Sequence, residues 1–168
     1  MIPEAQYIIG ATLVGLGATF LIDLWALFLR RAFHIPSLNY CFLGRWLLHM
    51  PAGTVIHRSI ATAQQRPHEC TLGWVAHYVI GTALALIFVS LASGSWLERP
   101  TLMPALAFGA VTTLVPFLIM QPSFGLGIAA SKTPNPNQAR LKSLMTHTVF
   151  GVGLYLWAVL LSPILFPA

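Results

Sequence analysis

The chain has 168 residues, of which 57% are hydrophobic and 8% are charged, and its formal net charge is +5. A soluble domain carries about a quarter charged residues, so this composition excludes an ordinary water-soluble fold and indicates an integral membrane protein. The positive charge does not indicate a nucleic-acid-binding protein, because the basic residues lie between hydrophobic segments and form no basic domain. We therefore expect the lipid bilayer, and no nucleic acid, around the chain.

Long intervals with few charges predict four transmembrane helices. Crossing the hydrocarbon core of a bilayer takes about 20 apolar residues in a helix. The uncharged intervals 70–97, 100–131 and 143–168 are long enough, and a first apolar segment continues past Asp23. We expect an all-α membrane protein, with one domain over residues 1–168 in which four helices form a bundle. The predicted helices cover approximately residues 6–29, 72–94, 101–121 and 144–166, and the predicted loops cover residues 30–71 and 122–143.

The basic residues indicate the orientation of these helices. Of the nine Lys and Arg residues, five lie in the first long loop and three in the second. The ninth, Arg99, lies in the short connection between the second and third predicted helices. Cytoplasmic loops of membrane proteins carry an excess of Lys and Arg. We therefore expect a bacterial inner-membrane protein with both long loops in the cytoplasm and both termini in the periplasm. Either loop can also be a simple connection between helices.

The first long loop contains a pattern typical of a short helix lying in the membrane interface. Apolar residues recur at helical spacing from Phe42 to Met50, with Arg45 and His49 on the opposite face, and residues 51–53 would end the helix. We expect the histidines of this loop to be solvated. They are His34, His49, His57 and His68.

The two cysteines, Cys41 and Cys70, belong to this same loop region. Their spacing is not that of a zinc site, and two cysteines do not make the dense framework of a disulfide-rich domain. On the cytoplasmic side of a membrane we expect them to be reduced thiols. The sequence 68–70, His-Glu-Cys, offers consecutive metal ligands, which is a weak signal for a metal site.

Two segments resemble each other and suggest an internal duplication. The sequences 77–81 and 147–151 share the pattern H-x-V-x-G near the start of the second and fourth helices. Pro-Ser pairs at 36–37 and 122–123 follow the first and third helices in the same order. A two-helix unit repeated in parallel would explain these matches. Chance similarity between apolar helices is the alternative explanation.

Three ionisable residues are predicted to lie inside the spans: Asp23, His77 and His147. Burying such groups in a bilayer is unfavourable, so they are candidates for function. All three fall at similar depth near the cytoplasmic side, so the helices can bring them together. Gly81 and Gly151 follow the two histidines by four residues and would make room for a neighbouring helix or a ligand.

Four roles suit a cluster of this composition. Hydrogen bonds between helices would hold the bundle together, and a proton or ion pathway would use the same groups as a relay. Two imidazoles and a carboxylate are also ligands for a divalent metal, and His77 with His147 would suit axial haem ligation. The sequence requires none of these cofactors, and the identity of any metal is unknown.

No motif indicates an enzyme. The chain lacks G-x-S-x-G, H-E-x-x-H and a phosphate-binding glycine loop, so catalysis at the membrane surface ranks third among the classes of function. The leading hypothesis is a small transport-like or ligand-binding module centred on the Asp/His cluster. The alternative is a non-catalytic accessory or structural subunit that binds a membrane partner protein through glycine-rich helix faces. The partner can also be a second copy of the chain, in a homo-oligomer.

Six stretches spread over nearly the whole chain are specific enough to compare with known families. They are Asp23-Leu-Trp-Ala-Leu27, Ile35-Pro-Ser-Leu-Asn-Tyr40, Gly44-Arg-Trp-Leu47, Leu72-Gly-Trp-Val-Ala-His-Tyr78, Met120-Gln-Pro-Ser-Phe-Gly125 and Ala129-Ala-Ser-Lys-Thr-Pro-Asn-Pro136. They resemble a family of small bacterial inner-membrane proteins described as domain of unknown function 2938. The resemblance implies a protein that spans the membrane several times, and it implies no activity, substrate or site.

Because the matching stretches include both long loops, polar residues of these loops are second-tier candidates for a site on the cytoplasmic face. The basic ones among them could instead bind anionic lipid headgroups. The second-tier candidates are Asn39, Arg45, Ser123, Lys132, Asn135 and Arg140.

Overall fold

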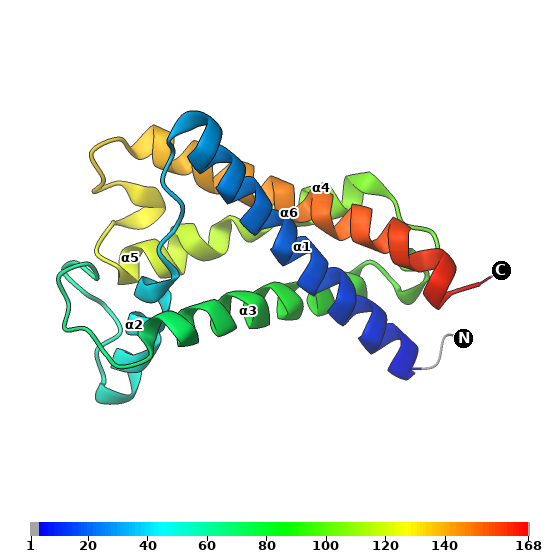
Figure 1. Ribbon diagram of the computed structural model, residues 1–168, viewed down its shortest axis with the longest axis horizontal. Helices are drawn as coiled ribbons and strands as arrows, with labels where there is room; N and C mark the ends of the chain where they lie inside the picture. Colours follow the sequence, from blue (N-terminus) through cyan, green and yellow to red (C-terminus); the bar gives the residue numbers. More distant parts are fainter. Residues whose placement is uncertain (1–3, 168) are drawn as a thin grey trace. The chain divides into compact units, whose positions relative to one another are not determined.

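The structure is a computed structural model that describes residues 4–167, and within this range the chain is helical and contains no strand (Figure 1). Three of its helices have 23 to 30 residues, and shorter helices connect them. In chain order the elements are α1 (Glu4–Phe33), α2 (Tyr40–His49), η1 (Met50–Ala52), α3 (Glu69–Leu91), η2 (Gly94–Trp96), α4 (Leu102–Thr112), η3 (Pro116–Met120), α5 (Gln121–Ser123), η4 (Ile128–Ala130) and α6 (Pro136–Leu165).

Four helical segments of the described chain are long and apolar enough to cross a membrane. The predicted fold class, an all-α membrane protein with four spanning helices, is confirmed. The segments are Glu4–Phe33, Glu69–Leu91, Leu102–Ser123 and Pro136–Leu165.

Two helix ends lie further into the predicted loops than hydropathy indicates. The helix α1 continues through Arg30 and Arg31 to Phe33, where basic side chains favour the negative end of the helix dipole. The helix α6 begins at Pro136 rather than near residue 144. Proline is favourable at a first helical position, and the polar residues that follow it carry no apolar signal.

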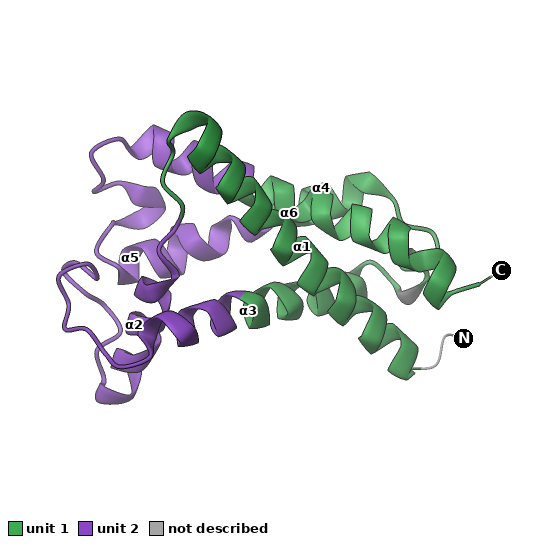
Figure 2. Ribbon diagram, viewed as in Figure 1, with its two compact units in different colours: residues 1–37, 78–111, 146–168 green, residues 38–77, 112–145 purple. Residues whose placement is uncertain are grey.

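The described chain forms two compact units, each treated by itself (Figure 2). The helices α3 and α6 contribute one part to each unit, and most of α4 belongs to the first. Unit 1 comprises residues 1–37, 78–111 and 146–168, and unit 2 comprises residues 38–77 and 112–145.

Unit 1 is held together by close approaches between helix backbones. A Cβ atom added at Gly153 of α6 would lie 2.8 Å from the Cα of Ala18 in α1, and one added at Gly109 of α4 would lie 2.5 Å from the carbonyl oxygen of His147. Gly17 faces the Trp157 ring at a distance that leaves no room for a side chain. Small residues dominate such contacts in membrane proteins because lipid provides little hydrophobic drive, and association relies on close packing.

Unit 2 combines short helices with irregular backbone. At Pro116, which cannot donate a backbone hydrogen bond, the chain widens into the π-helical turn η3. Further along, the peptide N–H groups of His57 and Ile60 donate to the carbonyls of Ser123 and Phe124 at 2.8 and 3.0 Å, so two loops distant in sequence are joined through their backbones.

Candidate functional site

The position of Asp23 follows from the face of α1 on which it lies. Gly15, Thr19 and Asp23 are spaced four residues apart, so they form one row along the helix. A Cβ at Gly15 would lie 2.7 Å from an α3 backbone atom, and a Cβ at Gly81 would overlap the Thr19 hydroxyl oxygen. At the end of this row the Tyr78 hydroxyl donates a hydrogen bond to Asp23 Oδ2 at 2.7 Å. The close approach of the two helices thus brings a phenol to the carboxylate.

Sequence reasoning missed Tyr78, a side-chain partner of Asp23. Tyrosine counts among the hydrophobic residues in composition, and its hydroxyl becomes relevant only once a polar neighbour is known. A signal was present: Tyr78 precedes Gly81 by three residues, which places both on nearly the same face of a helix. The expectation that Gly81 and Gly151 make room for a neighbouring helix is confirmed, because α1 and α4 respectively pack against them.

His77 lies in unit 2, where it contacts aromatic residues. The Tyr40 hydroxyl and His77 Nε2 are 3.1 Å apart, within hydrogen-bonding distance. The two rings are stacked with centroids 4.1 Å apart, and the Trp74 ring packs edge-on to His77 at 6.0 Å. His77 is therefore part of an aromatic cluster between α2 and α3, which sequence reasoning did not foresee.

The three residues proposed as one cluster do not all belong to one unit. Asp23 and His147 lie in unit 1, whereas His77 lies in unit 2. His147 is partly buried in α6, at the place where this helix approaches Gly109. Residues 4–167 contain no group of three or more His, Cys, Asp or Glu side chains placed to hold a metal ion. The three-residue metal site is therefore not formed, and haem ligation by the two histidines stays a prediction.

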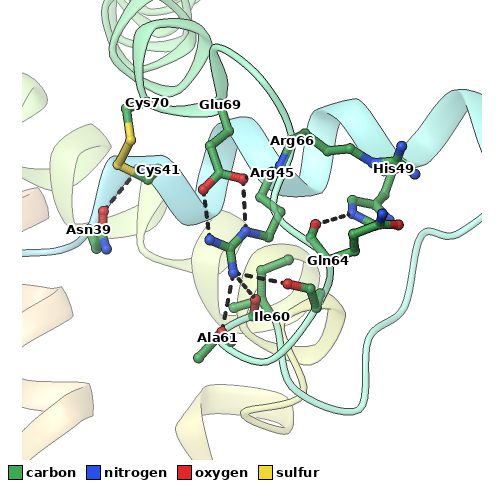
Figure 3. Close-up of polar contacts among 11 residues, drawn as sticks. Asn39, Cys41, Arg45, His49, Ile60, Ala61, Gln64, Arg66, Glu69 and Cys70 are labelled. Atoms are coloured by element: carbon green, nitrogen blue, oxygen red, sulfur yellow. Dashed lines mark hydrogen bonds and ion pairs between the residues drawn. A yellow bond between two sulfur atoms is a disulfide. The ribbon is translucent and has the colours of Figure 1, made fainter.

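Arg45 is the centre of a buried polar network in unit 2 (Figure 3). Its Nε and Nη2 groups donate to the Glu69 carboxylate at 2.9 and 2.7 Å. Its Nη1 group donates to the carbonyls of Ile60, Ala61 and Ala63 at 2.9 to 3.2 Å. The hydrogen-bonded Glu69 carboxylate raises the pKa of Arg45 above its already high usual value.

This network corrects two expectations. Arg45 is only 3% exposed, so it does not form the solvated face of an interfacial helix, and its guanidinium is not available to lipid headgroups. Glu69 pairs with Arg45, and no group of three or more metal-ligating side chains forms among the described residues, so the weak metal signal at residues 68–70 receives no support. The predicted short helix itself is confirmed as α2, and it ends where Pro51 and Gly53 follow. Its polar face is buried because the loop before α3 folds over it.

Two loop histidines expected in solvent are also buried. His49 and His57 are each 8% exposed, and their rings lie edge to face with centroids 5.1 Å apart. The backbone carbonyl of Gln64 lies 2.8 Å from His49 Nε2 (Figure 3). Burial, followed by the proximity of His49, lowers the pKa of His57 below its usual value. His34 and His68 are exposed, as expected.

Two second-tier candidates have structural roles near the ends of short helices. Asn39 caps α2, because its side-chain oxygen accepts a hydrogen bond from the Cys41 N–H at 3.0 Å. Ser123 is buried at the end of α5, and its carbonyl accepts the bond from His57 described above. Both residues support the loops of unit 2 through local hydrogen bonds.

The remaining second-tier candidates lie around the start of α6. Arg140 Nε donates to the carbonyl of Ala129 at 2.8 Å, and Ala129 has a left-handed backbone with a φ angle of 47°. The guanidinium thus helps to hold an unfavourable conformation in η4. Lys132 and Asn135 are exposed. These residues belong to unit 2, whereas Asp23 and Tyr78 belong to unit 1.

Cys41 and Cys70 form a disulfide, so the expectation of reduced thiols is wrong for this structure (Figure 3). The pairing follows from the close crossing of α2 and α3. A Cβ at Gly44 would overlap the carbonyl of Glu69, and a Cβ at Gly73 would overlap the carbonyl of Tyr40. A signal was available, because Cys41 and Cys70 each begin a C-x-L-G sequence.

Comparison with known proteins identifies the family but no characterised relative. Searches among curated proteins and among solved structures gave no match. A family match covers residues 12–161, most of the chain. The chain therefore belongs to the family described as "Protein of unknown function (DUF2938)".

Proposed function

We propose that this membrane protein is a small transport-like module in which Asp23 takes up and releases a proton. The supporting observation is the 2.7 Å hydrogen bond from the Tyr78 hydroxyl to Asp23 Oδ2. Both residues belong to helices long and apolar enough to span a membrane. An ionisable residue retained in such a helix, with a polar partner, is typical of proton and ion pathways.

The chemistry of the pair suits a change of protonation state. A carboxylate only accepts hydrogen bonds, whereas a protonated carboxyl group can also donate one. A phenol hydroxyl can donate and accept, so Tyr78 can remain a partner of Asp23 in both states. The row formed by Gly15 and Thr19 fixes the distance between the two helices and hence between the two side chains.

For the orientation, we propose a bacterial inner membrane with both long loops in the cytoplasm and both termini in the periplasm. The basis is the concentration of Lys and Arg in the two loops. Reporter fusions at the C-terminus would test this orientation, and a cytoplasmic C-terminus would contradict it. The bilayer is the proposed environment, with a second copy of the chain as the proposed partner, because four helices enclose little volume for a continuous path.

The decisive experiment measures proton flux into liposomes that contain the purified full chain and an internal pH dye. Under an imposed membrane potential, the wild type should acidify the vesicles, Asp23→Asn should abolish the flux, and Tyr78→Phe should reduce it. Glu98→Gln is the matched control for the carboxylate, because Glu98 is exposed and lies outside the spans. Tyr7→Phe is the control for the phenol, because Tyr7 also donates a hydrogen bond within unit 1, to Ser90.

The results also distinguish transport from a purely structural role. An asparagine at position 23 can still accept the hydrogen bond from Tyr78, so it preserves an interhelical contact but carries no exchangeable charge. A wild type that conducts no more than empty liposomes would contradict the proposal. A flux that persists in Asp23→Asn would exclude Asp23 as the proton-carrying group.

The alternative of an accessory subunit receives less support. It relied on glycine-rich helix faces that would bind a partner, but Gly15, Gly17, Gly109, Gly151 and Gly153 all pack against other helices of unit 1. Purification of the native protein with one abundant membrane partner would favour this alternative.

A further inference from the structure

The junction between α2 and α3 in unit 2 joins two matching sequences. Cys41 and Gly44 in α2 face Cys70 and Gly73 in α3, and the Cα atoms of the cysteines are 3.9 Å apart. The missing side chains of the glycines allow the backbones to approach this closely. The two helices are thus positioned for a covalent bond between residues 29 positions apart in the sequence.

A second interaction, which does not involve sulfur, also joins α2 and α3 at this junction. One turn along α2, Arg45 binds Glu69 through two hydrogen bonds and is almost completely buried. Reduction of the disulfide would release the first turn of α2 from its covalent bond to α3 but would leave this ion pair in place one turn further along α2. The two thiols would therefore remain close to each other, which is the condition for a disulfide that forms and breaks reversibly.

One cysteine of the pair is accessible to other molecules. Cys70 is exposed and Cys41 is partly buried. Cys70 is the second residue of α3, where the positive end of the helix stabilises a thiolate. The neighbouring Glu69 would oppose this effect, but its charge is paired with Arg45. Exposed disulfides are more readily reduced than buried structural ones.

The sidedness of the chain conflicts with a purely structural disulfide. Cys41 and Cys70 lie on the side that carries eight of the nine Lys and Arg residues, which we propose to be the cytoplasm. Disulfides in the cytosol are usually transient, and they serve in catalysis or redox sensing. The exposure of Cys70, the ion pair between Arg45 and Glu69, and the proposed cytoplasmic location together favour a reversible disulfide.

We propose that Cys41 and Cys70 form a thiol–disulfide exchange site that clamps the first turn of α2 to α3 when oxidised. This inference relies on the orientation proposed above and not on proton transport. The reductant is a cytosolic dithiol protein or two molecules of a small thiol such as glutathione. A donor thiolate attacks the Cys70 sulfur, which forms a mixed disulfide and releases Cys41 as a thiolate that takes up a proton.

A second donor thiolate then attacks the donor sulfur of the mixed disulfide and releases Cys70 as a thiolate. The donor becomes a disulfide and loses two electrons, while the protein gains two thiols. In the reverse direction Cys70 is the attacking thiolate on an oxidised donor. The disulfide restrains the aromatic cluster of Tyr40, Trp74 and His77. Tyr40 precedes Cys41 and packs on Trp74 with ring centroids 4.6 Å apart.

The test uses the full chain in lipid nanodiscs, equilibrated with glutathione buffers and then alkylated with a maleimide that shifts its gel mobility. At the cytosolic glutathione poise, the reduced form should exceed the oxidised form by about tenfold. A pair that stays oxidised in this buffer would overturn the proposal and identify a structural disulfide. The double variant Cys41→Ser/Cys70→Ser marks the unmodified band.

Single variants test the assignment of the accessible cysteine. The thiol of Cys70 in Cys41→Ser should react with iodoacetamide several-fold faster than the thiol of Cys41 in Cys70→Ser. A faster Cys41 would contradict the order of steps proposed here. The clamp has its own readout: reduction should change the tryptophan fluorescence of the wild type, and Trp74→Phe should lose this change. An unchanged wild-type spectrum would exclude the clamp.

A measurement in cells connects exchange to orientation. Acid-quenched cells should contain mainly reduced protein, and treatment with a thiol oxidant should convert it to the disulfide form. Protein that is oxidised in untreated cells would contradict the proposal. Reporter fusions measure the orientation separately, and a periplasmic junction between α2 and α3 would refute both the orientation and this inference. A proton-flux assay without flux would refute the proposed transport but would not contradict the exchange site.

Discussion

The two units of the molecule are stabilised by different kinds of contact. In unit 1, glycine and alanine allow helix backbones to approach, and polar contacts such as that between Tyr78 and Asp23 add to this packing. In unit 2, a buried ion pair, a disulfide and side chain to backbone hydrogen bonds hold short helices and loops. The difference has a physical cause: regular helices satisfy their own backbone groups, whereas irregular backbone needs other partners.

The largest expected effect comes from removing the polar centre of unit 2. Arg45→Gln would leave the Glu69 carboxylate and three loop carbonyls without their buried partner. Breaking a buried ion pair in this way costs about 3–5 kcal/mol of unfolding free energy. Unfolding in mixed detergent micelles measures the loss. Arg58→Gln, in the same loop but exposed, should have little effect. An equal loss of unfolding free energy in both variants would contradict the claim that the buried ion pair stabilises unit 2.

The close helix packing of unit 1 is tested by adding a single methyl group. Gly15→Ala gains helix propensity, but the new Cβ would lie 2.7 and 2.8 Å from atoms of Thr82 and Ala85. Overpacking of this kind costs about 1–3 kcal/mol, which exceeds the propensity gain. The same unfolding assay should show lower stability. Leu16→Ala, on the exposed face of the helix, is the control. A stabilised Gly15→Ala variant would contradict the packing.

The buried histidine of unit 2 predicts a dependence of stability on pH. Burial lowers the pKa of His57, so the unfolded chain binds a proton at a higher pH than the folded chain does. Stability from neutral His57 is therefore present above about pH 6.5 and is lost as the pH falls toward the lowered value, by at most about 1.4 kcal/mol per pH unit. His57→Gln should flatten the pH profile of unfolding, and His68→Gln, which is exposed, should not.

The smallest expected effect concerns the polar pair of unit 1. Tyr78→Phe removes the hydrogen bond to Asp23, and such bonds between membrane helices contribute about 0.6 kcal/mol on average. A double-mutant cycle with Asp23→Ala measures the coupling between the two side chains. A coupling of several kcal/mol would mean that unit 1 depends on polar contacts as unit 2 does. Little effect of Tyr78→Phe on stability together with a reduced proton flux would favour a functional role for the pair.

Particular residues mark the limit of what could be predicted. The helical spacing of apolar residues was sufficient to locate α2, but the same pattern placed Arg45 and His49 in solvent because it cannot say what covers a face. Asp23 stood out as a charge in an apolar segment, whereas Tyr78 did not. The repeated C-x-L-G sequence was a visible signal for the pairing of Cys41 with Cys70. The internal duplication stays a prediction.

The sequence by itself determined the number of spanning helices and the family, because hydropathy accumulates along consecutive residues and needs no knowledge of neighbours. Only the tertiary structure decided the partners of the polar and sulfur-bearing side chains. Asp23 and Tyr78 are 55 residues apart, and Cys41 and Cys70 are 29 apart. Such pairs depend on how closely two helices cross, and that is set by glycines whose effect appears only when both helices are in place.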